Sequence, residues 1–380
     1  MRTPNLRSER GIALVAAIVA LVVIGALVAG TFFVSSLEQK TAENSVDAAE
    51  AYQAAEAGIV KNVANWDTGN NSLATDAGTT IAQDSVAKGT YFNVTISRLN
   101  SSLFLLKSVG TRNGTTQSLA MVLRTVTVNP TVNAAVTVQG TVNVAGSASV
   151  TGTNTVPDGW TGCASATDKT GIDASGQIKT KGNPNISGNP AKTPNDTSVN
   201  TALFQTPFQQ FKAIAALSFV GGSGQGNYAT FSPSPSSTGS PAKCNTADQN
   251  NWGEPLRADQ TPYSAYVSQC AHYSPIVYIN GNAQLNANNR GQGILLVDGD
   301  LSVAGGFMWV GLVIATGQVK TGNGNSSITG ALMSQNAAIG DTTSLSGTPD
   351  IAYSRCALDW VLNNSAVARP LAMRSWGQVF

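Results

Sequence analysis

Residues able to carry acid–base or metal chemistry are few in this sequence. Histidine occurs once, at His272, so there is no second imidazole for a metal site or a proton relay. Asp298 and Asp300 form a close carboxylate pair, and residues two apart on a strand point to the same side. They flank Gly299, which favours a solvated turn, with a bound calcium ion as the weaker alternative. The sequence therefore predicts no catalytic site and no cofactor.

The composition narrows the class of protein. Only 11% of the 380 residues are charged and the net charge is +1, whereas about 25% of residues are charged in an ordinary soluble domain. Without a basic stripe to neutralise phosphates, we expect no nucleic-acid partner. The 42% hydrophobic content argues against intrinsic disorder. The abundance of glycine, 38 residues, together with Ser, Thr and Asn, indicates a β-rich, turn-rich protein of extracellular type.

The amino terminus carries a candidate membrane span. No charged residue occurs from Gly11 to Leu37, and a helix needs about 20 apolar residues to cross the hydrocarbon core. Three arginines precede this stretch: Arg2, Arg7 and Arg10. The positive-inside rule therefore predicts a cytoplasmic leader (1–11), an inner-membrane span (12–34) and a carboxy-terminal domain outside the cytoplasm. A cleaved secretory signal is the alternative, but its apolar core would be shorter and Leu27-Val28-Ala29 is a poor cleavage site.

The helix is expected to continue beyond the membrane as an amphipathic half (35–66). Apolar residues recur there at spacings of three and four. They are Ala42, Val46, Ala49, Tyr52, Ala55, Ile59, Val63 and Trp66. The turn residues from Asp67 to Asn71 end the pattern. An uninterrupted helix from Ile12 to Trp66 would be about 80 Å long.

Two motifs on this helix resemble those of a known family. Arg10-Gly11 followed by Ile12-Ala13-Leu14-Val15-Ala16 is similar to the prepilin peptidase site of type IV pilin-like proteins. Ala51-Tyr52-Gln53-Ala54-Ala55-Glu56-Ala57-Gly58 resembles a segment of PilX-type pilus assembly proteins. The resemblance implies cleavage between Gly11 and Ile12, methylation of the new amino terminus and assembly into a filament. It also implies three kinds of partner: prepilin peptidase, other pilin-like subunits and the inner-membrane assembly platform.

The residue at position 16 departs from the major pilins of that family. They carry Glu as the fifth residue after the cut, where this chain has Ala16. A carboxylate inside a bilayer costs about 2.5–3.5 kcal/mol on insertion scales, so a subunit without it avoids this cost and gives up a pairing with its neighbour. The resemblance then implies a minor pilin near the filament tip. The alternative is that Ala16 marks a protein that is never cleaved.

A small antiparallel meander is expected at residues 67–128. Three segments alternate apolar with polar residues: Tyr91–Leu99, Phe104–Thr111 and Ser118–Val128. Arg112-Asn113-Gly114 between the last two is a strong hairpin signal.

Glycine then recurs every six residues in two tracts. The first tract has Gly140, Gly146 and Gly152, and the second has Gly293, Gly299, Gly305, Gly311 and Gly317. Paired apolar residues repeat in step with them, which is typical of a β-helix or β-solenoid. We therefore expect a solenoid-like head at 129–355, with a β-sandwich as the competing fold. Residues 291–301, 353–357 and 374–376 also resemble the carboxy-terminal domain of long PilX-type proteins.

Residues 153–275, between the tracts, are expected to be a loop-rich insertion, with a helix starting at Thr206-Pro207. Its Gly-, Ser- and Pro-rich part, 221–241, is the best guess for a surface that binds a cell surface or a polysaccharide.

The cysteines fit a protein exposed to an oxidising compartment. They are even in number and lack metal-type C-x-x-C spacing: Cys163, Cys244, Cys270 and Cys356. Of the three pairings we favour Cys244–Cys270, which closes a local loop, leaving Cys163–Cys356 to tie the insertion to the carboxy-terminal tail (356–380). Free buried thiols are the alternative.

The expected fold class is α+β: a long pilin-like helix with a small antiparallel sheet, followed by a β-solenoid-like head. The expected function is that of a minor pilin-like subunit of a type IV pilus or pseudopilus, displayed at the tip for assembly, adhesion or both. A single-span anchored adhesin or envelope scaffold is the alternative. A polysaccharide-active β-helix enzyme comes third, because such enzymes need clustered carboxylates.

Overall fold

The computed structural model describes residues 10–64, 66–126, 130–199, 202–257, 267–322, 324–339, 348–364, 367–371 and 376–378. The described residues fall into two compact units. The first unit takes those within 1–65, 76–123 and 370–380, and the second takes those within 66–75 and 124–369.

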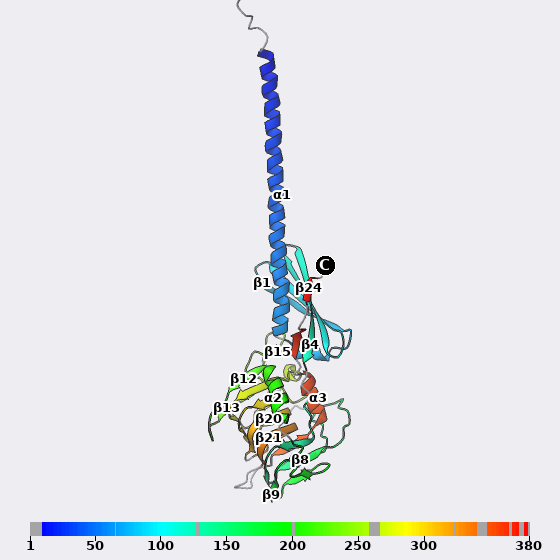
Figure 1. Cartoon of the computed structure of the whole chain (residues 1–380), viewed down its shortest axis with the longest axis vertical. Helices are drawn as coiled ribbons and strands as arrows, with labels where there is room; N and C mark the ends of the chain where they lie inside the picture. Colours follow the sequence, from blue (N-terminus) through cyan, green and yellow to red (C-terminus); the bar gives the residue numbers. More distant parts are fainter. Residues whose placement is uncertain are drawn as a thin grey trace, which may run out of the picture. The chain divides into compact units, whose positions relative to one another are not determined.

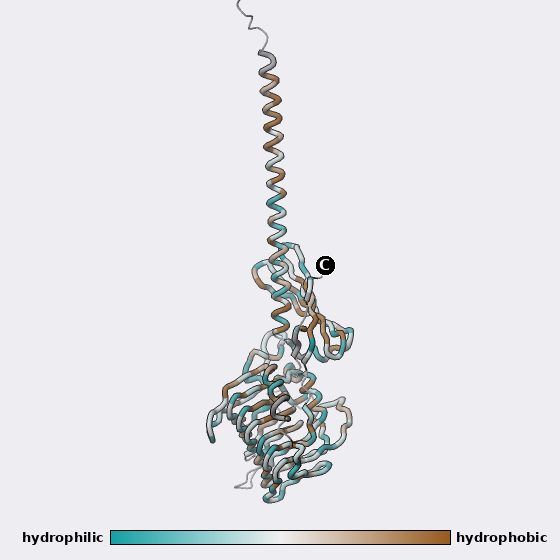
Figure 2. Tube along the Cα trace, in the orientation of Figure 1, coloured by the Kyte–Doolittle hydropathy of each residue, from teal (hydrophilic) through white to brown (hydrophobic). Residues whose placement is uncertain are grey.

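The first unit begins with one continuous helix, α1 (Arg10–Ala64), of 55 residues (Figure 1). At about 1.5 Å per residue it is about 80 Å long, as expected from the sequence. It contains no proline, and good helix formers such as Ala and Leu fill much of it. Figure 2 shows that hydrophobic residues are concentrated in its amino-terminal half. The chain after it forms the short 3₁₀ helix η1 (Thr68–Ser72), where Asp67 Oδ1 accepts a hydrogen bond from Gly69 N at 2.8 Å.

An antiparallel sheet completes the first unit. It is built from β1 (Gly78–Ala87), β2 (Thr90–Arg98), β3 (Leu103–Arg112) and β4 (Thr115–Val126) in that order, and β24 (Trp376–Gln378) pairs antiparallel with β4. Strand β23 (Val367–Pro370) lies where the second unit ends in sequence. The three strands expected from the sequence are present, and β1 is an additional one.

The expected hairpin turn between β3 and β4 is also present. Asn113 and Gly114 adopt φ values of 48° and 86°, which is the left-handed pair that an Asn-Gly hairpin turn requires.

The second unit is dominated by a 16-stranded sheet whose paired strands, within the described residues, run parallel. The strands that come first in the sequence are β5 (Ala134–Val138), β6 (Val142–Gly146), β7 (Ser149–Thr151), β8 (Thr170–Ala174), β9 (Ile178–Gly182), β10 (Asn185–Ser187) and β11 (Lys192–Thr193). Its later strands are β12 (Leu217–Val220), β13 (Ala229–Phe231), β16 (Ile276–Asn280), β17 (Ala283–Leu285), β18 (Arg290–Val297), β19 (Leu301–Val303), β20 (Met308–Thr321), β21 (Ser327–Ile339) and β22 (Asp350–Tyr353).

Smaller elements of this unit are α2 (Ala202–Ala213), α3 (Arg355–Asn364), the 3₁₀ helix η2 (Ser268–Cys270) and the antiparallel pair β14 (Ser237–Thr238) and β15 (Lys243–Cys244).

From β16 to β20 the register of the parallel strands follows a fixed interval. Ile276 lies opposite Ile294, Arg290 opposite Met308 and Leu301 opposite Val319, each pair 18 residues apart. Earlier in the chain the interval doubles to 36, as between Val136 and Ile172. The late strand β21 pairs with both β20 and the early strand β5. The order of the strands in the sheet therefore differs from their order in the sequence, because the late strand β21 lies beside the early strand β5.

Three parts of the expected insertion differ from the sequence interpretation. Residues 170–193 form β8 to β11 within the large sheet: β8 contributes Ile172 and Ala174 to the core, and Ile178 of β9 and Ile186 of β10 pack against it as partly buried side chains. Residues 221–241 include β13, which pairs with β17. Helix α2 begins at Ala202, so Pro207 lies inside it, and Phe208 and Phe211 are buried in the core.

Candidate functional site: the amino-terminal helix

The first half of α1 is apolar and fully exposed. Its side chains from Leu14 to Leu37 have no cover from the rest of the chain, and Leu21 and Phe32 are 70% and 73% exposed. The helix is long and apolar enough to cross a membrane, with a mean hydropathy of 2.7 in its most apolar window. So large an apolar surface is stable only when lipid or another protein covers it.

The second half of α1 packs against its own sheet through small residues. Ala51, Ala54, Ala55, Gly58 and Ile59 are buried, with Ile59 and Ala55 in contact with Leu119 of β4. A methyl group placed on Gly58 would overlap with Ser108 Oγ and lie 2.8 Å from the ring of Phe92. The Ala-Ala-Glu-Ala-Gly segment thus lets β2 and β3 approach the helix closely. Glu56, Gln53 and Val60 lie on the exposed side.

An ionic contact joins the end of this sheet to the helix. Arg112 Nε lies 2.9 Å from Glu50 Oε2 and 3.7 Å from Asp47 Oδ1. Asn113 Nδ2 donates to Asp47 Oδ1 at 3.0 Å, and Arg112 Nη1 donates to the carbonyl of Lys88 at 2.7 Å. Partly exposed ion pairs contribute about 0.2–1 kcal/mol each, so these contacts orient the hairpin more than they stabilise the unit.

The expected cleavage residues lie at the start of α1. Gly11 and Ile12 are its second and third residues, and Ala16 is exposed one turn later. The side chain of Ile12 and the whole leader before Arg10 lie outside the described residues.

Asp298 and Asp300 have structural contacts at the same 18-residue interval as the strands. Thr316 Oγ1 donates to Asp298 Oδ1 at 3.1 Å, and Gln318 N donates to Asp300 Oδ1 at 2.8 Å. The nitrogen of Asp300 in turn donates to Asn282 Oδ1 at 2.8 Å. Among the residues that the structure describes, no group of three or more His, Cys, Asp or Glu side chains is arranged to hold a metal. Asp298 and Asp300 therefore connect segments of the chain that are 18 residues apart.

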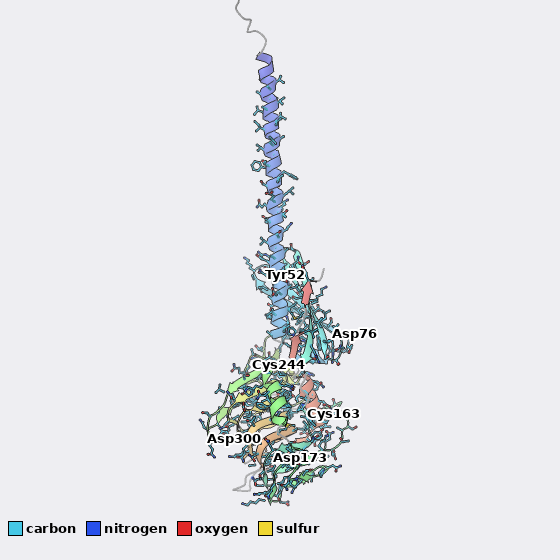
Figure 3. The ribbon with its side chains drawn as sticks, viewed as in Figure 1. Tyr52, Asp76, Cys163, Asp173, Cys244 and Asp300 are labelled. Atoms are coloured by element: carbon cyan, nitrogen blue, oxygen red, sulfur yellow. A yellow bond between two sulfur atoms is a disulfide. The ribbon has the colours of Figure 1, made fainter. Side chains whose placement is uncertain are left out.

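Both disulfides are present with the pairing favoured above. Cys244 is bonded to Cys270, with a sequence separation of 26, and Cys163 to Cys356, with a separation of 193. Figure 3 labels Cys163 and Cys244 in the second unit. The long-range bridge ties the segment after β7 to the first turn of α3.

An aromatic cluster beside the long-range disulfide was not anticipated from the sequence. The guanidinium of Arg257 lies 3.8 Å from the ring centre of Trp160 and 4.8 Å from that of Trp360. Trp360 also contacts His272, with ring centres 5.2 Å apart. Trp160, Arg257 and Trp360 are far apart in sequence, so no local pattern could have indicated their contact.

Comparisons with known proteins match the amino-terminal helix to that of a known family. The family model described as PilX N-terminal matches residues 10–60. No curated protein gives a significant match. Among solved structures, the competence-associated pilin ComZ from Thermus thermophilus matches 88% of this chain and 97% of its own, with 11% identity and a TM-score of 0.26. That structural similarity is too low to define the fold of this chain.

The family match confirms that the amino-terminal segment resembles that of PilX-type minor pilins. It covers α1 and does not extend into the antiparallel sheet or the second unit. The structure confirms a long amino-terminal helix followed by a large sheet-rich part, an α+β protein.

Proposed function

We propose that this protein is a minor pilin-like subunit of a type IV pilus or a related pseudopilus. The observation that carries the proposal is the division of α1 into a fully exposed apolar half and a half packed on its own sheet, over the segment that matches the PilX amino terminus. The exposed half is held by the inner membrane before assembly and by neighbouring subunits afterwards. Prepilin peptidase cleaves between Gly11 and Ile12, and the leader with its arginines stays in the cytoplasm.

Alanine at position 16 is what we expect of a minor subunit rather than of the major pilin that repeats along a filament. An alanine in the apolar half needs no partner in lipid, whereas a carboxylate there would need one. The subunit therefore enters the filament without the ionic pairing of a major pilin. A place at the tip, where it helps to initiate assembly, is consistent with this property.

We further propose that the second unit is a β-solenoid with three sides of six residues per turn. The 18-residue register supports this, because it equals three of the six-residue glycine periods. Positions 18 or 19 apart also meet in space: Gly311 lies against Gly293 and Gly330 against Gly311, and Gly317 lies against Gly299. The contacts from Asn282 to Asp300 and from Asp300 to Gln318 repeat at the same interval.

A domain as large as the second unit suits a subunit displayed at the filament tip better than one that repeats along the shaft. The second unit spans residues 124–369, and a surface or polysaccharide ligand for it would make the subunit an adhesin. We assign it no catalytic role. Its partly buried carboxylates Asp298 and Asp300 are engaged with neighbouring turns of chain.

Mass spectrometry of the mature amino terminus, on protein purified from its native membrane, tests the proposal. We expect a start at Ile12, with methylation, and recovery of the protein in sheared filaments. Gly11→Ala should block both, whereas Gly25→Ala, a glycine of the same helix that lies away from the cleavage site, should leave cleavage unchanged. An intact leader would instead support a single-span anchored adhesin, and a start near Gly30 would indicate a secreted protein.

A further inference from the structure

A row of polar side chains crosses seven strands of the large sheet. Consecutive members lie opposite one another in neighbouring parallel strands, so they point to the same face. Figure 1 labels four of these strands, β13, β20, β21 and β9, in the second unit. With neighbouring strands about 4.8 Å apart, the row is about 29 Å long. We call it the outer row, and its members in spatial order are Thr230, Gln284, Ser302, Lys320, Ala338, Asn143 and Lys179.

The strands that carry the outer row bury their other face. On β17, Gln284 is half-buried, and its two neighbours in sequence, Ala283 and Leu285, are buried. On β20, Lys320 is exposed, and both of its neighbours are buried. Successive side chains of a strand point to opposite faces, so the outer row faces solvent while its neighbours form the core.

The polar side chains of the outer row are not used to hold the sheet together. Among the described residues, none of them forms a hydrogen bond or an ion pair with another part of the chain. The positions two residues earlier on the same face differ in this respect. There, Asn282 and Asp300 each accept a hydrogen bond at 2.8 Å from the backbone nitrogen 18 residues later, and Asn336 accepts one from Thr141 N at 3.2 Å. The outer row therefore keeps its donors and acceptors for a ligand.

The charges in the outer row are all positive. Lys320 and Lys179 are three strands apart, which corresponds to about 14 Å, and neither forms an ion pair with a described residue. The carboxylate of Asp300 lies on the same face, but its Oδ1 already accepts a hydrogen bond from Gln318 N. Charge complementarity therefore favours an extended partner with spaced negative charges and neutral hydrogen-bonding groups between them.

We propose that the outer row binds a linear anionic polysaccharide whose chain runs across the strands. The amide and hydroxyl groups of Gln284, Ser302 and Asn143 can donate to and accept from sugar hydroxyls. Lys320 and Lys179 pair with the carboxylates of the polymer. A nucleic acid fits less well, because two lysines neutralise few phosphates and the row has no aromatic side chain for base stacking. This inference rests on the display role proposed for the second unit and gives that role a class of ligand.

Binding of alginate, a linear polymer of uronic acids, to the full-length protein in detergent tests the proposal by biolayer interferometry. We expect binding at low ionic strength that weakens as NaCl is added, because salt screens exposed charges, and no binding of neutral dextran. The double variant Lys179→Gln with Lys320→Gln should weaken alginate binding about tenfold, through the loss of two exposed charge pairs. Lys243→Gln, which removes an exposed lysine of β15 outside the large sheet, is the matched control and should bind as the wild type does.

A charge introduced into the outer row gives a test in both directions. Gln284 lies two strands from Lys320, so Gln284→Lys should bind alginate about threefold more tightly and Gln284→Glu about threefold more weakly, with unchanged circular dichroism.

The proposal is overturned if the wild type does not bind alginate at low ionic strength, or if the double lysine variant binds it as the wild type does. It is equally overturned if single-stranded DNA binds more tightly than alginate through the same lysines, which would assign the row to a nucleic acid. Recovery of the wild type in sheared filaments is measured separately. Its absence, with alginate binding intact, would contradict the pilin role and leave the ligand assignment standing.

Discussion

Gly110 of β3 lies directly against the backbone of α1 at Ala51. A methyl group on its α-carbon would overlap with the carbonyl oxygen of Ala51 and would come within 2.6 Å of the nitrogen of Ala55. Backbone atoms inside a helix cannot move aside without breaking its hydrogen bonds. The absence of a side chain at position 110 therefore determines how closely the sheet can pack on the helix.

The first prediction follows from this contact. Gly110→Ala should destabilise the first unit by about 3 kcal/mol, because overpacking against an immobile backbone separates helix and sheet. Thermal unfolding of the full-length protein, followed by circular dichroism, measures the loss. Gly377→Ala is the control, since this strand glycine of the same sheet has open space around it. Equal unfolding temperatures for the two variants would contradict the close packing described here.

The packing of α1 also shows what the sequence could and could not predict. The length of the helix follows from composition, and the expected strands follow from local alternation and the Asn113-Gly114 turn. The buried stripe follows only in part: Ala55 and Ile59 are buried as expected. Val46 and Ala49, expected on the packed face, are exposed, whereas Ala51, Ala54 and Gly58 are buried. Hydrophobic periodicity favours the larger apolar residues, but here the sheet approaches the side with the smallest ones.

The second unit shows the same division between local and non-local information. The six-residue glycine period is visible in the sequence, because each period is contained in one short stretch. The pairing of β5 with β8 at an interval of 36, and of β5 with the late strand β21, joins stretches that no local pattern connects. The outer row depends on the matching pairing of β6 with β21, so its members do not stand out in the sequence.

A second prediction concerns the glycine contacts of the large sheet. Gly311 has a φ of 132°, which disfavours any side chain, and a methyl group there would overlap with the carbonyl of Gly293. Gly311→Ala should cost about 3 kcal/mol or more from backbone strain and overlap together. Gly322→Ala, where the nearest atom would be the carbonyl of Val303 at 3.6 Å, should be tolerated.

Tryptophan fluorescence gives a selective measure of this loss. Five of the tryptophans lie in the second unit: Trp66, Trp160, Trp252, Trp309 and Trp360. The midpoint temperature of the thermal transition that these tryptophans report should fall for Gly311→Ala and stay unchanged for Gly322→Ala. A shift of the same size for both variants would mean that the contact between Gly293 and Gly311 has no special role.

The third prediction compares the two disulfides. In the chain-entropy relation, the bridge that closes the longer segment restricts the unfolded chain more. With separations of 193 and 26 residues, the loss of Cys163–Cys356 should cost about 2 kcal/mol more than the loss of Cys244–Cys270. Chemical unfolding of the two double serine variants measures the difference. The relation fails for this protein if the Cys244–Cys270 variant is the less stable one.

The fourth prediction concerns a buried ion pair. Arg290 donates to both oxygens of Glu254, from Nε at 2.9 Å and from the terminal nitrogen at 2.7 Å, and Glu254 is 0% exposed. Glu254→Gln leaves a buried guanidinium without its counter-charge and should destabilise the second unit by about 3–5 kcal/mol. Asp359→Asn removes the exposed pair with Arg355 on α3 and should cost under about 1 kcal/mol. Chemical unfolding followed by tryptophan fluorescence gives both values, and similar losses would mean that Arg290 finds another partner.

The last prediction concerns the only histidine. Partial burial, followed by the positive charge of Arg257, lowers the pKa of His272 below its usual 6.5, while Asp67 acts in the opposite direction. A sample labelled on histidine gives one resonance, so its titration can be followed directly by NMR. Arg257→Gln should raise the pKa, because a positive charge that disfavours the imidazolium is removed. Asp67→Asn, which keeps an oxygen to cap η1, should lower it further. If both variants titrate as the wild type does, the charges around the Trp160–Trp360 cluster do not reach His272, and its shift comes from burial alone.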